Sequence, residues 1–270
     1  MSECTNEKVT VLVSSHDKYM DAWEIFDYGI RKYWPDCPFK ILMITNYAQP
    51  KLRSLKILPV GDDKGWGSNL LSALNKIKTP YVLYLQEDYW FKKHVDTNSI
   101  KDFIRIMGEY SVDYIRLNAN PPPEHRCSLN SMLGTIAAEA TYKTALQASI
   151  WRKEVLESLV SSHDNPWEFE KKGPVRSQKC SGDFLAIRLP EDNVFEYVGA
   201  IRKGKWTRSA ENYLQQEDLK FPSSSIKSEN FFDQLKNGNL VLLRLYRVFE
   251  YISKGEVVKL KRKIKERIWM

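Results

Sequence analysis

Short apolar runs alternate with stretches of helical apolar spacing along the first third of the chain. Residues 9–14, 39–45 and 55–60 are mainly apolar runs that stop at polar residues, which is typical of buried strands. Residues 20–33 and 68–77 place their apolar side chains at helical spacing instead. The pattern therefore predicts three strands and two helices before residue 80.

A fourth apolar run, YVLYL at residues 81–85, ends abruptly at Gln86, Glu87 and Asp88. Strands that alternate with helices at this spacing favour a mainly parallel sheet with right-handed crossovers and helices on its faces. The predicted fold class is therefore α/β. In open sheets of this class, ligands bind at the carboxyl ends of the strands, which is where these three polar side chains stand.

The pattern loosens after Asp88, and a long irregular stretch follows three consecutive prolines at residues 121–123. Because long loops in compact domains are commonly functional, we expect acceptor recognition in this half. The elements predicted here are helices at 100–107 and 151–159, strands at 114–117, 145–149 and 194–201, and an apolar helix at 240–252. We predict a catalytic domain over residues 1–210, with a donor-binding half at about 1–95 and an acceptor half at about 96–210, followed by a helical extension over 211–270.

The charge of the chain is unevenly distributed. The 270 residues carry a formal net charge of +7, with 43% hydrophobic and 28% charged residues, as in an ordinary globular protein. Residues 259–270 contribute six basic side chains and one acid, so this tail alone supplies +5. A nucleic-acid-binding body needs its positive charge spread over a face, so no nucleic-acid partner is expected. G-x-S-x-G and H-E-x-x-H motifs are absent, which gives no support to esterase or protease chemistry.

The four cysteines, Cys4, Cys37, Cys127 and Cys180, are widely spaced and form no C-x-x-C pair. This spacing favours free thiols in a reducing compartment. The first residues show no secretory signal pattern, and no apolar run reaches the roughly 18–20 residues that a membrane span needs. We therefore predict a cytoplasmic protein.

Glu87 and Asp88 are the first candidates for chemistry. One or two carboxylates can hold a divalent cation whose other ligands are the phosphates of a substrate and water. Such a site at the end of a buried strand points to an enzyme that uses a nucleotide sugar. The alternative is an exposed acidic turn after a strand.

A resemblance to a known family rests on five segments: VTVLVSSHD, KILMITN, GWGSNLLSALNKIKTPYVLYLQEDYWF, QASIWRKEVL and NPWEFE. Together they resemble bacterial GT-A fold glycosyltransferases, the inverting, family-2-like enzymes that build surface polysaccharides, over roughly residues 9–206. In that family an aspartate-rich turn holds the metal and the nucleotide diphosphate. Gln86 stands here at the usual first aspartate and Asp88 at the last, so the resemblance implies Mg²⁺ or Mn²⁺ on a weakened acidic motif, with Asp88 and then Glu87 as ligands.

The resemblance also implies where the donor binds. The polar turn after the first strand would lie near the nucleobase and ribose, a place from which side chains can hydrogen-bond a base. Ordinary turn chemistry would equally explain its residues. Ser68 is expected at a helix N-cap, where amides face anions. The remaining donor-binding candidates are Ser14, Ser15, His16, Asp17, Asn46, Asp63, Trp66, Asn69 and Gln86.

Two acids in NPWEFE are candidates for the general base that takes the proton of the acceptor hydroxyl. Apolar surroundings raise the pKa of a carboxylate towards neutrality, which suits this role. Asn165, Pro166 and Glu168 also fit a capping box, which would give Glu168 a structural role. The family pattern has its acid after Trp-x-Phe, so Glu170 is favoured and Glu168 is the alternative.

Aromatic and cationic side chains complete the predicted site. Gln147 and Trp151, at the start of a predicted helix, are candidates for the sugar pocket, although Trp151 could equally be a core residue. Tyr89, Trp90 and Trp167 are further candidates for the acceptor side. Cations after the last predicted strand could neutralise the leaving diphosphate, or could belong to an ordinary surface loop. They are Arg202, Lys203 and Lys205.

The basic tail also carries apolar positions and ends in Trp269-Met270. A basic amphipathic helix suits an anionic membrane surface, where lipid-linked acceptors reside; a solvated helix packed on its own domain is the alternative. The leading hypothesis is a glycosyltransferase, at the inner face of the cell membrane, that moves a sugar from a nucleotide-sugar donor to a glycan or lipid-linked acceptor. The alternatives are a sugar nucleotidyltransferase and a non-catalytic, membrane-associated scaffold of the same fold.

Overall fold

The computed structural model describes residues 6–223, 226–230 and 233, and these fall into two compact units. The first unit comprises residues 6–200 and 220–223, and the second comprises 201–219, 226–230 and 233. The apolar helix predicted at 240–252, the basic tail and Cys4 lie outside the described residues. The boundary predicted at residue 210 stays a prediction.

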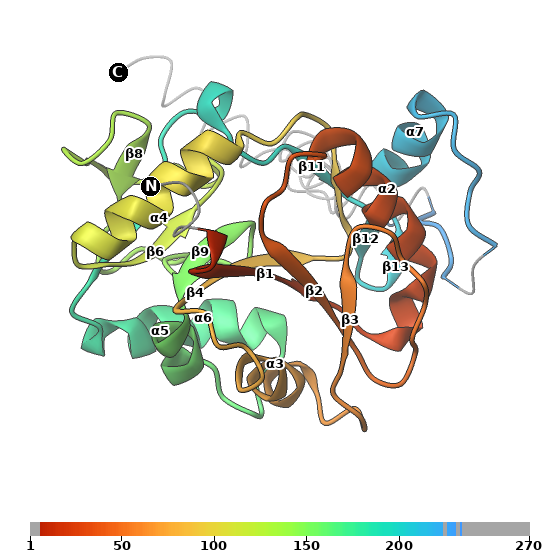
Figure 1. The fold of residues 1–270 in the computed structure, drawn as a ribbon, viewed down its shortest axis with the longest axis horizontal. Helices are drawn as coiled ribbons and strands as arrows, with labels where there is room; N and C mark the ends of the chain where they lie inside the picture. Colours follow the sequence, from red (N-terminus) through yellow and green to blue (C-terminus); the bar gives the residue numbers. More distant parts are fainter. Residues whose placement is uncertain (1–5, 224–225, 231–232, 234–270) are drawn as a thin grey trace, which may run out of the picture. The chain divides into compact units, whose positions relative to one another are not determined.

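A nine-stranded sheet is the centre of the first unit (Figure 1). Its strands, in sheet order, are β3 (Lys56–Pro59), β2 (Lys40–Thr45), β1 (Val9–Ser14), β4 (Tyr81–Gln86), β9 (Ser149–Arg152), β6 (Val112–Arg116), β10 (Asp183–Ile187), β8 (Leu133–Thr135) and β7 (His125–Arg126). Strand β9 runs antiparallel to both of its neighbours, and β8 does so as well, whereas the other pairings are parallel. The sheet is therefore mixed but mostly parallel.

Helices cover both faces of this sheet. Helices α2 (Trp23–Tyr33) and α4 (Thr97–Glu109) lie on one face, and α3 (Trp66–Leu74), α5 (Lys153–Leu159) and α6 (Pro166–Arg176) lie on the other (Figure 1). Both faces of β1 and β4 are buried, which explains why their sequences are continuous apolar runs rather than alternating ones. The predicted α/β class, a mainly parallel sheet flanked by helices, is confirmed.

Short elements complete the first unit. Two strands, β5 (Tyr89–Phe91) and β11 (Tyr197–Gly199), pair antiparallel beside the main sheet. Three short 3₁₀ helices are η1 (Asp17–Ala22), η2 (Ser177–Lys179) and η3 (Pro190–Asp192). The stretch predicted as irregular at 124–135 contains β7 and β8.

Several predicted boundaries are wrong. The helix expected from residue 20 begins as an α-helix only at Trp23, because the residues before it form η1. Trp151 was expected at the start of a helix but lies in β9, where its backbone pairs with Val82 of β4 and Tyr114 of β6. Helix α5 therefore begins only at Lys153. The strand expected over 194–201 is divided between β11 and a strand of the second unit.

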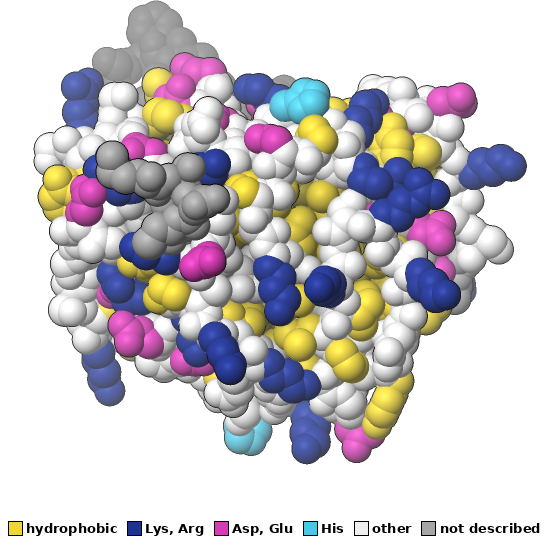
Figure 2. All heavy atoms as spheres, viewed as in Figure 1, with side chains coloured by type: hydrophobic (Ala, Val, Ile, Leu, Met, Phe, Trp, Pro, Cys, Tyr) yellow, Lys and Arg dark blue, Asp and Glu magenta, His cyan; other side chains and the backbone are white. Residues whose placement is uncertain are grey.

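The second unit contains a hairpin and a helix, namely β12 (Ile201–Arg202), β13 (Lys205–Trp206) and α7 (Arg208–Gln216). The hairpin turns through Lys203 and Gly204, both at positive φ, a conformation that glycine adopts without steric cost. No helix among the described residues is long and apolar enough to cross a membrane. Lys and Arg side chains on the face shown in Figure 2 are dispersed among acidic and apolar ones.

Candidate active site

The order of the strands reverses between β1 and β4. From β1 the chain proceeds outwards to β2 and β3, and it then returns to place β4 on the opposite side of β1. Ser14 at the end of β1 is in register with Gln86 at the end of β4. Open α/β sheets bind ligands outside the carboxyl ends of strands at such a reversal. The predicted polar residues after β1 and β4 therefore meet at one edge of the sheet.

Asp17 joins the end of β1 to the end of β2. Its Oδ1 accepts the backbone N–H of Asn46 at 2.8 Å, and its Oδ2 accepts those of Tyr47 and Ala48 at 2.8 and 2.9 Å. Burial tends to raise the pKa of Asp17, but the three N–H donors outweigh burial and the pKa is lowered. The ionised carboxylate thus fixes the loop after β2.

His16 and Asp63, 47 residues apart, form a second link at this edge. His16 Nδ1 accepts the backbone N–H of Lys18 at 3.0 Å, so the other ring nitrogen, Nε2, is the one placed to donate to Asp63 Oδ2 at 2.9 Å. Asp63 also accepts the N–H of Gly65 and the side-chain amide of Asn69. The Gly65 N–H lowers the pKa of Asp63 most, and His16 and Asn69 contribute further. The network brings the segment after β3 against the turn after β1.

The other residues predicted in these segments have defined partners. Ser15 Oγ accepts the indole N–H of Trp23 at 2.7 Å, and Ser14 is buried. The prediction that Ser68 caps a helix is wrong. Gly65, at φ +89°, occupies the N-cap of α3, because its positive φ lets the chain enter the helix earlier, at Trp66. Ser68 Oγ instead donates to the backbone carbonyl of Ser162 at 3.1 Å.

The end of β4 presents a buried acid, Glu87, followed by a half-buried one, Asp88. Burial, together with the neighbouring Asp88 charge, raises the pKa of Glu87 well above its usual value. No group of three or more His, Cys, Asp or Glu side chains able to hold a metal occurs within residues 6–223, 226–230 and 233. The assignment of Asp88 and then Glu87 as metal ligands stays a prediction, and one or two carboxylates suffice only together with substrate phosphates and water.

Hydrogen bonds of the Leu146 backbone link Glu170 to side chains at the end of β4. Because β9 is antiparallel to β4, the residues that precede it lie at the carboxyl edge of the parallel strands. The Leu146 N–H donates to Glu170 Oε1 at 2.9 Å, and its carbonyl accepts from Gln86 Nε2 at 3.3 Å and Tyr89 Oη at 3.0 Å. One residue, Leu146, thus connects Glu170 to the two side chains that flank Glu87 and Asp88.

The two candidate bases have opposite environments. Burial raises the pKa of Glu170, although the Leu146 N–H and the Arg116 charge oppose this. Glu168 closes the predicted capping box: its Oε2 accepts the Asn165 N–H at 3.0 Å, and its own N–H donates to Asn165 Oδ1 at 2.9 Å. The Asn165 N–H lowers the pKa of Glu168 most, and Lys172 lowers it further. The geometry therefore gives Glu168 the structural role of the capping box, whereas Glu170 as the base stays a prediction.

Only some of the side chains predicted to contact the acceptor are exposed to solvent. Tyr89 stacks on Tyr197, with 4.1 Å between the ring centroids and an interplanar angle of 20°. Trp90 and Trp151 are both 0% exposed and belong to the core, so they line no open surface in this structure. Trp167, by contrast, is 62% exposed, and it precedes Glu170 by three residues on α6. Residues at this spacing are neighbours on a helix surface.

Two further predicted groups have contacts of their own. Gln147 Nε2 donates to the carbonyl of Asn120 at 2.7 Å, which fixes the loop before β9. Arg202, Lys203 and Lys205 belong to the second unit, where Lys205 forms an ion pair with Asp233 at 2.7 Å. A role for these three cations at the diphosphate stays a prediction.

The sequence analysis missed two cations of the first unit. The charge of Lys18 lowers the pKa of Glu87, and that of Arg116 lowers the pKa of Glu170. Arg116 is the last residue of β6 and is only 1% exposed. A cation inside the short strand predicted at 114–117 was a readable signal, because charged residues are seldom fully buried without a function or a partner.

The sequence matches no protein-family model and no curated protein. Among solved structures, the chain is similar to the crystal structure of S. aureus TarS 1-349, with 14% identity, a TM-score of 0.48, and coverage of 72% of this chain and 60% of that one. It is also similar to the mannosyltransferase PcManGT from Pyrobaculum calidifontis in complex with GDP-Man and Mn²⁺, with 14% identity, a TM-score of 0.45, and coverage of 73% and 58%. This chain thus spans about 60% of the length of the TarS structure. Likenesses of this degree carry no functional argument.

Proposed function

We propose that this protein is a GT-A type glycosyltransferase that moves a sugar from a nucleotide-sugar donor to an acceptor hydroxyl, with inversion at the anomeric carbon. The position of Glu170 carries the proposal. Glu170 is a carboxyl of raised pKa, and Leu146 links it to Gln86 and Tyr89 at the end of β4, next to β1. A base and a nucleotide site that share one edge of a sheet are what this reaction requires.

The nucleotide would bind over the ends of β1, β2 and β3. The hydrogen bonds of Asp17 and the His16–Asp63 pair hold the three loops there in a fixed arrangement. Such loops present backbone groups and the imidazole to a base or ribose without further ordering, which lowers the entropic cost of binding. Asp88 would hold a divalent cation, Mg²⁺ or Mn²⁺, which when bound neutralises charge on the departing diphosphate.

Glu170 would take the proton of the acceptor hydroxyl as that oxygen attacks the anomeric carbon. The new carbon–oxygen bond forms while the bond to the β-phosphate oxygen breaks, so the nucleoside diphosphate leaves and the proton stays on Glu170. A raised pKa makes an ionised carboxylate a stronger base. The exposed ring of Trp167 lies on the same helix, where it could stack on an acceptor sugar.

The acceptor class and the location belong to the same proposal. A glycan or lipid-linked glycan would be reached at the inner face of the cell membrane, to which the basic tail over residues 259–270 would bind. This part rests on sequence alone, because the tail lies outside the described residues.

A binding experiment tests the donor half of the proposal. Nucleotide sugars that differ in base and sugar are added to the wild-type protein, with and without Mn²⁺, and the melting temperature is measured. At least one should raise it, as a ligand specific for the folded state does. Asp88→Asn should reduce the part of the shift that depends on Mn²⁺, whereas Glu168→Gln should not. If no nucleotide sugar stabilises the wild-type protein, the proposal is wrong.

A further inference from the structure

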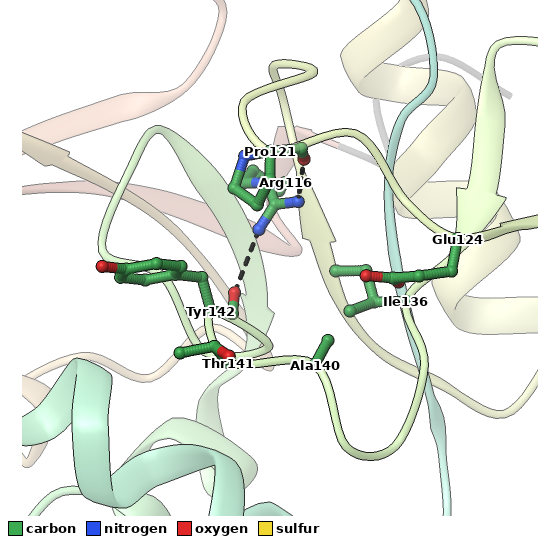
Figure 3. Close-up of a pocket in the computed structure, with 7 residues that line it drawn as sticks. All are labelled: Arg116, Pro121, Glu124, Ile136, Ala140, Thr141 and Tyr142. Carbon is green, nitrogen blue, oxygen red and sulfur yellow. Dashed lines mark hydrogen bonds between the residues drawn. The ribbon is translucent and has the colours of Figure 1, made fainter. Parts of the chain in front are cut away.

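A cavity of about 280 Å³ lies between the end of β6 and the loop before β9. Its wall is mainly apolar, with one buried cation and one acid, and Figure 3 shows the side chains around it. They are Arg116, Pro121, Glu124, Ile136, Ala140, Thr141 and Tyr142. Tyr142, one of these lining residues, is itself 50% exposed. An apolar wall with few polar groups is usual for ligand sites.

Arg116 is the unusual group in this wall. It is only 1% exposed, and no Asp or Glu within residues 6–223, 226–230 and 233 lies within 4.0 Å of its guanidinium nitrogens. Its Nη1 donates to the carbonyl of Tyr142 at 3.1 Å and its Nη2 to that of Pro121, as Figure 3 shows. Its Nε has no hydrogen-bond partner among the described residues. The Tyr114 hydroxyl is a further polar neighbour of the guanidinium. A guanidinium has five N–H groups, so two carbonyls do not use all of them, and Nε is the donor left over.

The direct contacts of Arg116 are thus neutral carbonyls, and the nearby acids Glu124 and Glu170 lie farther than 4.0 Å away, so its burial is only partly compensated by opposite charge. Arg116 is also strongly suited to planar, bidentate contact with an oxyanion. The cavity beside it provides the space for one.

The cavity and Glu170 share one segment of chain. Residues 140–142 form part of the cavity wall, and Leu146, four residues later, donates its N–H to Glu170. The charge of Arg116 acts on Glu170 as well. A molecule whose hydroxyl reaches Glu170 could therefore extend into the cavity.

We propose that this cavity is a subsite for an anionic group of the acceptor, a phosphate or a sugar carboxylate, which Arg116 binds. The acceptor assignment rests on the proposed function, whereas the anion site itself does not. Glu124 lines the same cavity, and its Oε2 accepts the Ala137 N–H at 2.9 Å. Its charge repels an anion, so the bound group would lie at the Arg116 end.

Three small probes test the subsite without a nucleotide sugar. Glycerol 3-phosphate, glucuronate and glucose are titrated into the wild-type protein at constant ionic strength, and binding is measured by calorimetry. At least one of the two anions should bind, and glucose should bind at least about tenfold more weakly than that anion, a factor that corresponds to one charge-assisted hydrogen bond. The comparison of phosphate with glucuronate shows which anion the subsite takes.

Three variants locate the binding. Arg116→Gln should weaken anion binding at least about tenfold, and Glu124→Gln should strengthen it, because it removes the repelling charge while its side-chain oxygen can still accept the Ala137 N–H. Arg188→Gln is the matched control, since Arg188 also donates to a loop carbonyl, that of Ser131, but does not line the cavity. It should leave binding unchanged.

Equal binding of glucose and the anions, or weaker anion binding in Glu124→Gln, would overturn the proposal. Unchanged binding in a folded Arg116→Gln protein would do so too. Should Arg116→Gln fail to fold, because Arg116 also joins two loops, Glu124→Gln decides the outcome alone. Anion binding without any sugar transfer would leave the subsite in place and count against the proposed function only.

Discussion

Glu168 and Glu170 show how two identical side chains on one helix acquire different chemistry. Glu168 is at the exposed N-terminus of α6, where the Asn165 N–H and Lys172 stabilise its ionised form. Glu170 contacts the loop before β9, and burial there disfavours the charge. The capping box was predictable from sequence because it depends on residues only three positions apart. The contact of Glu170 with Leu146 was not predictable, because the two residues are 24 positions apart.

The raised pKa of Glu170 predicts the acid limb of the pH–rate profile. A general base must be ionised, so kcat/KM should fall as the pH decreases through the pKa of Glu170. Since that pKa is above the usual glutamate value, the fall should occur at a higher pH than for an exposed carboxylate. The measurement is kcat/KM from pH 4 to 8. Glu168→Gln, which removes the acid of lowered pKa, should not change the pH at which kcat/KM falls. A change of that pH in Glu168→Gln would contradict the assignment of Glu170 as the base.

Glu87 gives a prediction about stability. The pKa of Glu87 is raised in the folded state. The carboxyl therefore makes its full contribution to the free energy of unfolding below the pKa that Glu87 has in the unfolded chain, and this contribution is lost as the pH rises through its pKa in the folded protein. Glu87→Gln remains neutral throughout, so it should be more stable than wild type at pH 7.5, and this advantage should disappear near pH 4. Melting temperatures at both values measure the effect. The exposed Glu139→Gln is the control. A Glu87→Gln protein that is less stable than wild type at pH 7.5 would show that the ionised group is favoured.

At the scale of elements, strands marked by their own apolar sequence were predictable. Strands whose position depends on pairing with strands far away in the sequence were not. β1 and β4 are buried on both faces, so their continuous apolar runs match the predicted ranges closely. β9 has four residues, and its position depends on β4 and β6, more than 30 residues away in sequence. The sequence could not show that this strand runs antiparallel. For that reason it could not show that Leu146 lies beside Gln86.

Helix α6 must approach the loop before β9 closely for Glu170 to reach Leu146. A Cβ at Gly173 would lie 2.3 Å from Thr144 Oγ1, and Thr144 is fully buried. Gly173→Ala should therefore destabilise the protein by about 1–3 kcal/mol, although alanine favours helices. Urea unfolding measures the change. Thr144→Ala in the same protein should restore part of the loss, because it removes the clashing hydroxyl. An additive double variant would mean that the two residues do not meet.

At the scale of the whole molecule, the sequence predicted which strand ends carry polar residues, and the topology explains why they converge. The reversal between β1 and β4 places the segments after β1, β2, β3 and β4 at one edge. The Arg116 cavity was not predicted, since its wall comes from three separate loops and strands. The predicted contributions of Arg202, Lys203 and the basic tail concern the second unit or residues outside the described part, and they stay predictions.

The most direct test of the central claim is the release of nucleoside diphosphate during sugar transfer. The assay uses the nucleotide sugar that stabilises the protein most, together with glycan and lipid-linked acceptors. It compares wild type with Glu170→Gln and Glu168→Gln, which make the same chemical change two residues apart on α6. Loss of a general base should lower kcat about 10²–10⁴-fold in Glu170→Gln, with Glu168→Gln close to wild type. Equal rates in Glu170→Gln and wild type, or a large loss in Glu168→Gln alone, would contradict the account.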